Sequence, residues 1–127
     1  MDFYLTKNNS QNRLLEEYQN HGSLVVAFDF DDTVYDFHKK NRVYTDVITL
    51  IRKLKTINCY LICWTGQEDL EFVANYLMAN DIPFDSINEN PPFHKLKSKK
   101  IYANAYLDDR AGLHQVYTEL NYLTENV

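Results

Sequence analysis

The chain has 127 residues, of which 45% are hydrophobic and 24% are charged, a balance typical of one folded domain rather than a disordered chain. Its net charge of -5 argues against tight, nonspecific binding of duplex nucleic acid by the whole surface, although a local basic patch stays compatible with it. No apolar run approaches the length of a membrane span and the polar N-terminus lacks a signal-peptide core, so we expect a cytoplasmic protein with no membrane partner.

Apolar residues at helical spacing predict helices, and short apolar runs bounded by polar residues predict strands. In chain order, the expected elements are a lead-in helix near Gln11–Asn20 closed by Gly22, a strand over Leu24–Phe30, a polar turn over Thr33–Arg42, a helix over Thr45–Thr56, a strand over Cys59–Trp64, a helix over Gln67–Asn80, a short strand at Ser86–Ile87, a polar loop over Asn88–Lys100, a strand over Ala103–Leu107 and a helix over Leu113–Glu125.

Strands and helices therefore alternate along the whole chain. This alternation predicts an α/β fold with a Rossmann-like, mainly parallel sheet, right-handed crossovers and helices on both faces. We expect one domain over residues 1–127, with a lead-in helix within residues 1–22 and a core over about residues 23–125.

The two cysteines, Cys59 and Cys63, lie in one apolar strand segment. Positions four apart on a strand are roughly 13 Å apart, which is too far for a disulfide. The four histidines are scattered, so a zinc site lacks ligands. Two buried, reduced thiols are expected.

Polar residues follow three of the expected strands at the points where the strands end. These residues are Asp29 and Asp31 after the first strand, Thr65 and Gly66 after the second, and Asp108 and Asp109 after the last long one. The carboxyl ends of parallel strands meet at one edge of a sheet, where functional groups gather. Hard oxygen ligands on neighbouring strands suit Mg²⁺, and a hydroxyl beside free amides suits phosphate oxygens.

A cluster of lysines, Lys95, Lys97, Lys99 and Lys100, lies shortly before the last expected strand. A lysine from this cluster can neutralise the charge of both a phosphate and a carboxylate. Lys100 directly precedes the approach to the strand and is the favoured candidate, and the others fit a solvated basic loop.

Taken together, these residues resemble the haloacid dehalogenase (HAD) superfamily of phosphohydrolases. The segment from Asp29 to Val34 matches its D-x-D-x-[TV] first motif, and Thr65-Gly66 matches the second. A lysine before the last strand matches the third motif, and Asp108-Asp109 matches the fourth. The resemblance covers about residues 23–115, and residues 106–110 also resemble the fourth motif in phosphatase domains of polynucleotide kinases.

The resemblance implies a magnesium-dependent phosphomonoesterase. It implies that Asp29 is the nucleophile that forms an aspartyl-phosphate, and that Asp31 protonates the leaving oxygen and then activates water. Thr65 and Gly66 would hold the phosphoryl oxygens together with Lys100. Mg²⁺ would be held by Asp29, the main-chain carbonyl of Asp31, and the pair Asp108 and Asp109.

Many members of this superfamily carry a cap domain inserted after the first or second motif. Neither the segment between Asp31 and Thr65 nor that between Gly66 and Lys100 is long enough for one. We therefore expect an open, capless site that accepts a small phosphorylated molecule or a phosphate at a polymer end, nucleotides and nucleic acids among them, in a monomer or a homo-oligomer.

Parts of this pattern also fit other interpretations. Seen alone, Asp31-Asp32-Thr33 fits a turn, and Asp108-Asp109 fits a helix cap. A calcium-binding EF-hand loop from Asp29 fails because Val34 replaces the required glycine and Lys40 the terminal glutamate. A phosphorylation-receiver domain does not fit either, because its aspartate, threonine and lysine follow one another in a different order along the chain. A HAD-like binding protein without turnover stays open as an alternative.

Overall fold

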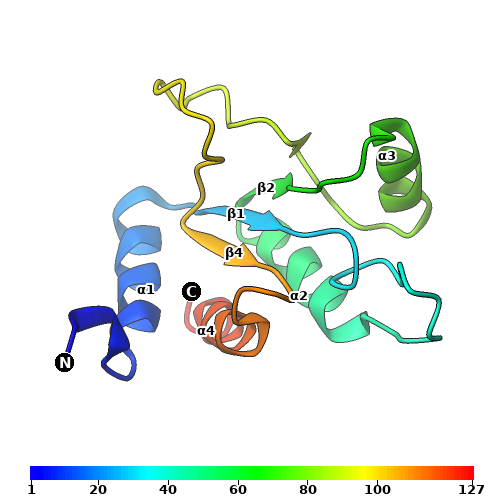
Figure 1. Ribbon diagram of the computed structural model, residues 1–127. Helices are drawn as coiled ribbons and strands as arrows, with labels where there is room; N and C mark the ends of the chain where they lie inside the picture. Colours follow the sequence, from blue (N-terminus) through cyan, green and yellow to red (C-terminus); the bar gives the residue numbers. More distant parts are fainter.

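The computed structural model describes all 127 residues. Helices and short strands follow one another along the chain (Figure 1). The helices are η1 (Phe3–Leu5), α1 (Asn9–His21), α2 (Thr45–Thr56), α3 (Leu70–Ala79) and α4 (Leu113–Glu125), and the strands are β1 (Val25–Phe28), β2 (Tyr60–Cys63), β3 (Ser86–Ile87) and β4 (Ala105–Leu107).

The four strands form one all-parallel sheet in the order β3-β2-β1-β4, so the expected α/β fold with a parallel, Rossmann-like sheet is confirmed. Phe28, the last residue of β1, is paired with Cys63 of β2 and with Leu107 of β4. The three strands consequently end at the same level of the sheet, which brings the residues that follow them to a common edge.

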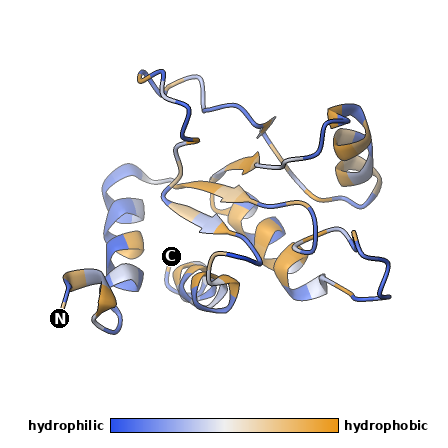
Figure 2. Cartoon of the chain, viewed as in Figure 1, coloured by the Kyte–Doolittle hydropathy of each residue, from blue (hydrophilic) through white to orange (hydrophobic).

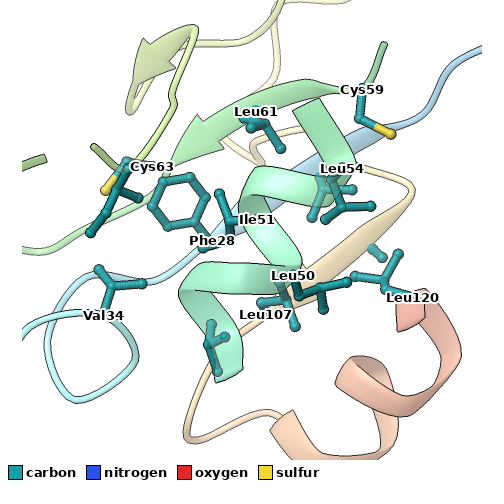
Figure 3. Close-up of a cluster of buried hydrophobic side chains, with 14 of the residues drawn as sticks. Phe28, Val34, Leu50, Ile51, Leu54, Cys59, Leu61, Cys63, Leu107 and Leu120 are labelled. Carbon is teal, nitrogen blue, oxygen red and sulfur yellow. The ribbon is translucent and has the colours of Figure 1, made fainter. Parts of the chain in front are cut away.

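The strands of the sheet are largely hydrophobic (Figure 2), and one face of the sheet carries the main hydrophobic core (Figure 3). Side chains alternate along a strand, and Val26, Phe28, Leu61 and Leu107 all point to this face. All four α-helices bury residues in the same cluster, namely Leu14 of α1, Leu50, Ile51 and Leu54 of α2, Val73 and Leu77 of α3, and Leu120 and Leu123 of α4. The expectation of helices on both faces is therefore wrong.

The opposite face has a smaller cluster of Val25, Ala27, Ile62 and Ile101. Ile101 belongs to the segment 88–104, which joins β3 to β4 and contains no helix. The connections from β1 to β2 and from β2 to β3 both run toward the β3 edge of the sheet, whereas the connection from β3 to β4 runs back to the opposite edge. Crossovers between parallel strands are right-handed, so this last connection must cross the face opposite to α2 and α3. Because its polar, lysine-rich sequence forms no helix, an irregular segment covers this face instead.

Several boundaries differ from those expected. β1 ends at Phe28 rather than Phe30, and α3 begins at Leu70 rather than Gln67. Asp69 caps α3, because its side chain accepts a hydrogen bond from the backbone N–H of Phe72. The positive potential of this helix N-terminus thus lies three residues further from Thr65 than the sequence suggested.

Two other expectations about local structure are confirmed. Gly22 ends α1 in the left-handed conformation, with a φ of 70°, as the sequence indicated. Cys59 and Cys63 are free and buried, as expected. No helix in the structure is both long and apolar enough to cross a membrane.

Candidate functional site

Three carboxylates gather where β1 and β4 end. Asp29, Asp108 and Asp109 each offer an oxygen within 4.8 Å of the others. Asp29 lies directly after β1, and its backbone N–H donates a hydrogen bond to the carbonyl of Leu107 (2.8 Å), so the ladder with β4 continues for one residue beyond the strand. The sequence-predicted acidic residues of these two strand ends are therefore brought together.

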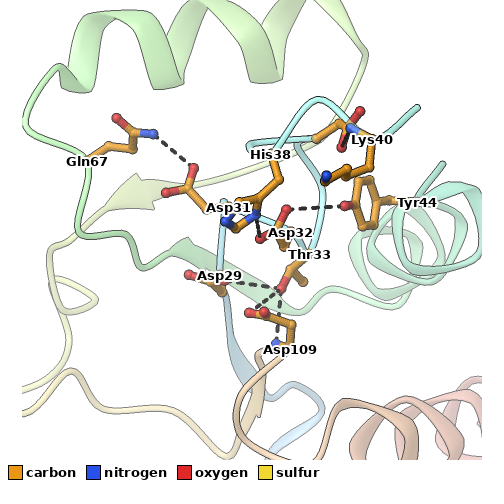
Figure 4. Close-up of polar contacts among 10 residues, drawn as sticks. Asp29, Asp31, Asp32, Thr33, His38, Lys40, Tyr44, Gln67 and Asp109 are labelled. Atoms are coloured by element: carbon orange, nitrogen blue, oxygen red, sulfur yellow. Dashed lines mark hydrogen bonds and ion pairs between the residues drawn. The ribbon is translucent and has the colours of Figure 1, made fainter. Parts of the chain in front are cut away.

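The buried hydroxyl of Thr33 links the two acidic segments (Figure 4). Thr33 Oγ1 donates to Asp29 Oδ2 at 3.2 Å and accepts from the backbone N–H of Asp109 at 3.1 Å. Thr33 belongs to the first motif, but the sequence alone assigns it no role. Its position four residues after Asp29 was the available signal, because a tight turn can return a hydroxyl to that carboxylate.

The three carboxylates form no ion pair with a lysine, arginine or histidine. The pKa of Asp29 is raised from 3.8 to about 7, mainly by burial, and the negative charge of Asp108 and a side-chain hydrogen bond with Asp109 contribute in the same direction. Such uncompensated charge in an all-oxygen donor set fits a hard divalent cation such as Mg²⁺.

Asp31 lies apart from this cluster and faces the chain that follows β2. Gln67 Nε2 donates to Asp31 Oδ1 at 2.9 Å (Figure 4). Gln67 is a second residue without an expected role. Its only signal in the sequence is that it directly follows Thr65-Gly66.

Asp32, in contrast, belongs to the turn. It has a φ of 59°, and its side chain contacts Nδ1 of His38 (2.6 Å) and accepts from the hydroxyl of Tyr44 (3.4 Å). These contacts fix the polar segment after β1 to the start of α2. This geometry agrees with the expectation that Asp32 forms the turn, in contrast to Asp29 and Asp31, which were expected to carry the chemistry.

Thr65 is buried directly after β2, and the side chain of Asn88 forms hydrogen bonds with both its backbone N–H and its carbonyl. The backbone N–H of Thr65 donates to Asn88 Oδ1 (2.8 Å), and Asn88 Nδ2 donates to the carbonyl of Thr65 (2.9 Å). Asn88 was not singled out in the sequence, and its position just after the short strand β3 was the only indication.

Two donors stay free at this strand end. The N–H of Gln67 donates to Thr65 Oγ1 (3.1 Å), so the Thr65 oxygen accepts one bond and its own proton has no partner. The N–H of Gly66 likewise has no partner in the protein. The expected phosphate cradle is thus narrower than the sequence suggested, since the amides of Thr65 and Gln67 are already used.

Lys100 is exposed and forms no ion pair. It lines a cavity of about 560 Å³ that also reaches Trp64, Tyr106 and Asp108. Lys95, Lys97 and Lys99 are exposed as well. Lys100 stays the predicted motif lysine on the strength of this shared cavity with Asp108.

Another cavity, of about 620 Å³, lies at the other end of the sheet. It is lined by residues near the strand starts, such as Leu24 and Tyr60, and by Phe93 of the segment that crosses the sheet. Its one carboxylate, Asp85, is already paired with Lys55 at 2.7 Å. The acidic cluster, and not this cavity, is the better candidate site.

Comparison with known proteins supports the fold. No family model and no curated protein matches the chain. A solved structure described as a conserved protein from Bacteroides thetaiotaomicron is similar, with a TM-score of 0.64 and 22% sequence identity over 79% of this chain and 91% of that one. At this identity the likeness shows a shared α/β architecture.

Proposed function

We propose that the protein is a magnesium-dependent phosphomonoesterase that acts through an aspartyl-phosphate on Asp29. The observation that carries the proposal is the cluster of Asp29, Asp108 and Asp109 within 4.8 Å of one another at the carboxyl ends of β1 and β4. The resemblance of the sequence motifs to HAD phosphohydrolases supports the same conclusion.

Asp29, Asp108 and Asp109 would hold Mg²⁺, together with the carbonyl of Asp31, which accepts no hydrogen bond within the protein. When bound, the ion supplies positive charge that reduces repulsion between a carboxylate nucleophile and an anionic phosphate. The remaining catalytic work falls to side chains of this chain.

In the first step, a carboxylate oxygen of Asp29 forms a bond to phosphorus while the bond from phosphorus to the leaving oxygen breaks. Asp31 donates its proton to that leaving oxygen, which departs as an alcohol. In the second step, a water oxygen forms a bond to phosphorus while the bond from phosphorus to Asp29 breaks, and Asp31 takes the water proton. Inorganic phosphate leaves, and the Asp29 carboxylate is restored.

Neighbouring residues hold these groups in place. Thr33 orients Asp29 through the 3.2 Å hydrogen bond, and Gln67 orients Asp31 through the 2.9 Å bond. The free donors of Thr65 and Gly66 would bind two phosphoryl oxygens, and Lys100 would balance the charge of the third. No cap domain separates the site from solvent, because the chain between Asp31 and Thr65 forms only α2 and β2, and the chain between Gly66 and Lys100 forms only α3 and β3.

Purified protein incubated with p-nitrophenyl phosphate and Mg²⁺ tests the proposal. Turnover over many cycles, lost in EDTA and in Asp29→Asn, is expected. Phosphorylation that stops at one phosphate per protein would indicate a receiver-like domain, and metal binding without turnover would indicate a binding protein. A panel of nucleotides, sugar phosphates, phosphopeptides and 3′-phosphorylated oligonucleotides would then rank the substrates.

A further inference from the structure

An exposed aromatic surface lies beside the proposed phosphate site. Trp64 directly precedes Thr65 and is the only tryptophan of the chain, and 40% of its surface is exposed. Its ring lies 5.7 Å from that of Tyr106, at an interplanar angle of 52°. An indole left this exposed offers a flat apolar surface to a ligand.

The position of Trp64 follows from the sheet register. Phe28 pairs with Cys63, so Trp64 and Asp29 are the next residues on two neighbouring strands. Trp64 continues the alternation of Tyr60 and Ile62, which point to the face without helices. Because an irregular segment and not a helix crosses this face, the indole stays accessible.

The cavity beside Trp64 reaches the acidic cluster at Asp108. Its volume of about 560 Å³ lies within the range of small-molecule sites, and its lining joins Trp64 and Tyr106 with Lys100 and Asp108. A group attached to a phosphate at Asp29 can therefore enter between an aromatic wall and a lysine. Aromatic stacking beside a cation is the chemistry that binds nucleobases and their phosphates.

The spacing favours a nucleoside over a phenyl ring. Neighbouring strands are about 4.8 Å apart, and the indole projects further along the face without helices. A ring stacked on Trp64 must then be joined to phosphorus through a spacer, which a ribose provides. In an aryl phosphate, only one oxygen separates the ring from phosphorus.

We propose that the leaving group of the substrate is a nucleoside whose base stacks on Trp64, within the cavity shared with Tyr106 and Lys100. This inference rests on the proposed phosphatase function, because that function places the phosphate of the substrate at Asp29. The shared chemistry is a base, a sugar and a terminal phosphate, which either a free nucleotide or the end of a single-stranded oligonucleotide supplies.

Fluorescence of the single tryptophan tests the inference without turnover. In the Asp29→Asn variant with Mg²⁺, adenosine 5′-monophosphate or 3′-monophosphate should quench Trp64 in a saturable manner, and glycerol 3-phosphate should not. Calorimetry should show that Trp64→Ala weakens nucleotide binding by about tenfold or more, and that Trp64→Phe recovers most of it. Phe3→Ala, at an exposed aromatic on η1, is the matched control and should bind as the parent does.

The outcomes separate this inference from the proposed function. Saturable quenching that depends on Trp64 supports the nucleotide site even if no phosphate ester is hydrolysed. Turnover of aliphatic phosphates with no quenching by nucleotides overturns the inference and leaves the phosphatase intact. Tighter binding of phosphotyrosine than of either nucleotide also overturns it.

An oligonucleotide arm identifies the source of the base. A phosphorylated octanucleotide that binds at least about tenfold more tightly than the mononucleotide, with affinity that falls as salt rises, assigns the site to strand ends. Equal affinities assign it to free nucleotides. Both results support a nucleoside on Trp64.

Discussion

The hydroxyl of Thr33 donates a hydrogen bond to Oδ2 of Asp29 at 3.2 Å and accepts one from the backbone N–H of Asp109 at 3.1 Å. One buried side chain thereby connects the ends of β1 and β4, the two strands that carry the acidic cluster. This contact sets the spacing between the proposed nucleophile and the residues expected to hold the metal.

Replacing Thr33 by valine should weaken both the fold and the site. The change keeps the shape but leaves the N–H of Asp109 and a carboxylate oxygen of Asp29 without this partner, at a cost of about 1–3 kcal/mol. We expect a lower thermal midpoint and a lower kcat, measured by calorimetry and with p-nitrophenyl phosphate. Thr33→Ser restores the hydroxyl and should recover most of both, and an unchanged valine variant would contradict this role.

Asp29→Asn should abolish turnover and also stabilise the metal-free protein at neutral and alkaline pH. Because the folded-state pKa of Asp29 is about 7, above its ordinary value of 3.8, its contribution to stability is full below about pH 4 and is lost as pH rises through 7. The stability difference between variant and parent in EDTA should therefore grow from pH 4 to 7 and then level off. Asp81→Asn, at an exposed aspartate outside the acidic cluster, is the matched control.

Magnesium should raise the thermal midpoint of the parent protein, because a ligand that binds only the native state stabilises it by mass action. The shift should shrink in Asp109→Ala and in Asp108→Ala, and the variant with the smaller shift identifies the stronger ligand. Asp81→Asn again serves as the control, with a full shift. An undiminished shift in both alanine variants would place the metal elsewhere.

The sequence predicted the fold and the acidic cluster well because both follow from local pattern. Alternating apolar runs predicted the strands, and the carboxyl ends of parallel strands brought Asp29 together with Asp108 and Asp109. Helices on both faces were expected from the usual layering of parallel sheets. The segment 88–104 forms no helix. That this segment must cover the second face of the sheet follows from the strand order β3-β2-β1-β4, which the sequence pattern does not predict.

Residues that orient others were harder to foresee. Thr33, Gln67 and Asn88 act through side-chain contacts across 4, 36 and 23 positions of the chain. Nothing in their own residue type distinguishes them from ordinary turn residues. The positions of the lysines also depend on the course of an irregular segment, which no periodicity describes.

Gln67→Leu should lower turnover with little effect on the fold. The substitution removes the 2.9 Å hydrogen bond to Asp31 and leaves that carboxylate free to rotate, so the position needed for the proposed proton transfer is lost. We expect kcat to fall more than KM rises, with a changed pH–rate profile. Gln67→Glu tests the charge, since it places a second carboxylate beside Asp31. A kcat equal to that of the parent in both variants would mean that Gln67 does not position Asp31.

The thiols of Cys59 and Cys63 should resist modification as long as the sheet stays folded. Burial raises the pKa of Cys59 to about 11, and burial with the nearby charge of Asp29 raises the pKa of Cys63 to about 12. At pH 8, the reactive thiolate is then at most about one part in a thousand, against about a quarter of an unperturbed thiol of pKa about 8.5.

A disulfide reagent such as DTNB measures this directly. Native protein should release almost no thionitrobenzoate at pH 8, whereas guanidinium-unfolded protein should release two equivalents, one for each cysteine. Ser98→Cys, at an exposed position, should add one rapidly reacting thiol and so controls for reagent quality. Rapid labelling of Cys63 in the native parent would mean that β2 opens at low cost, because the thiol can react only when its strand leaves the core.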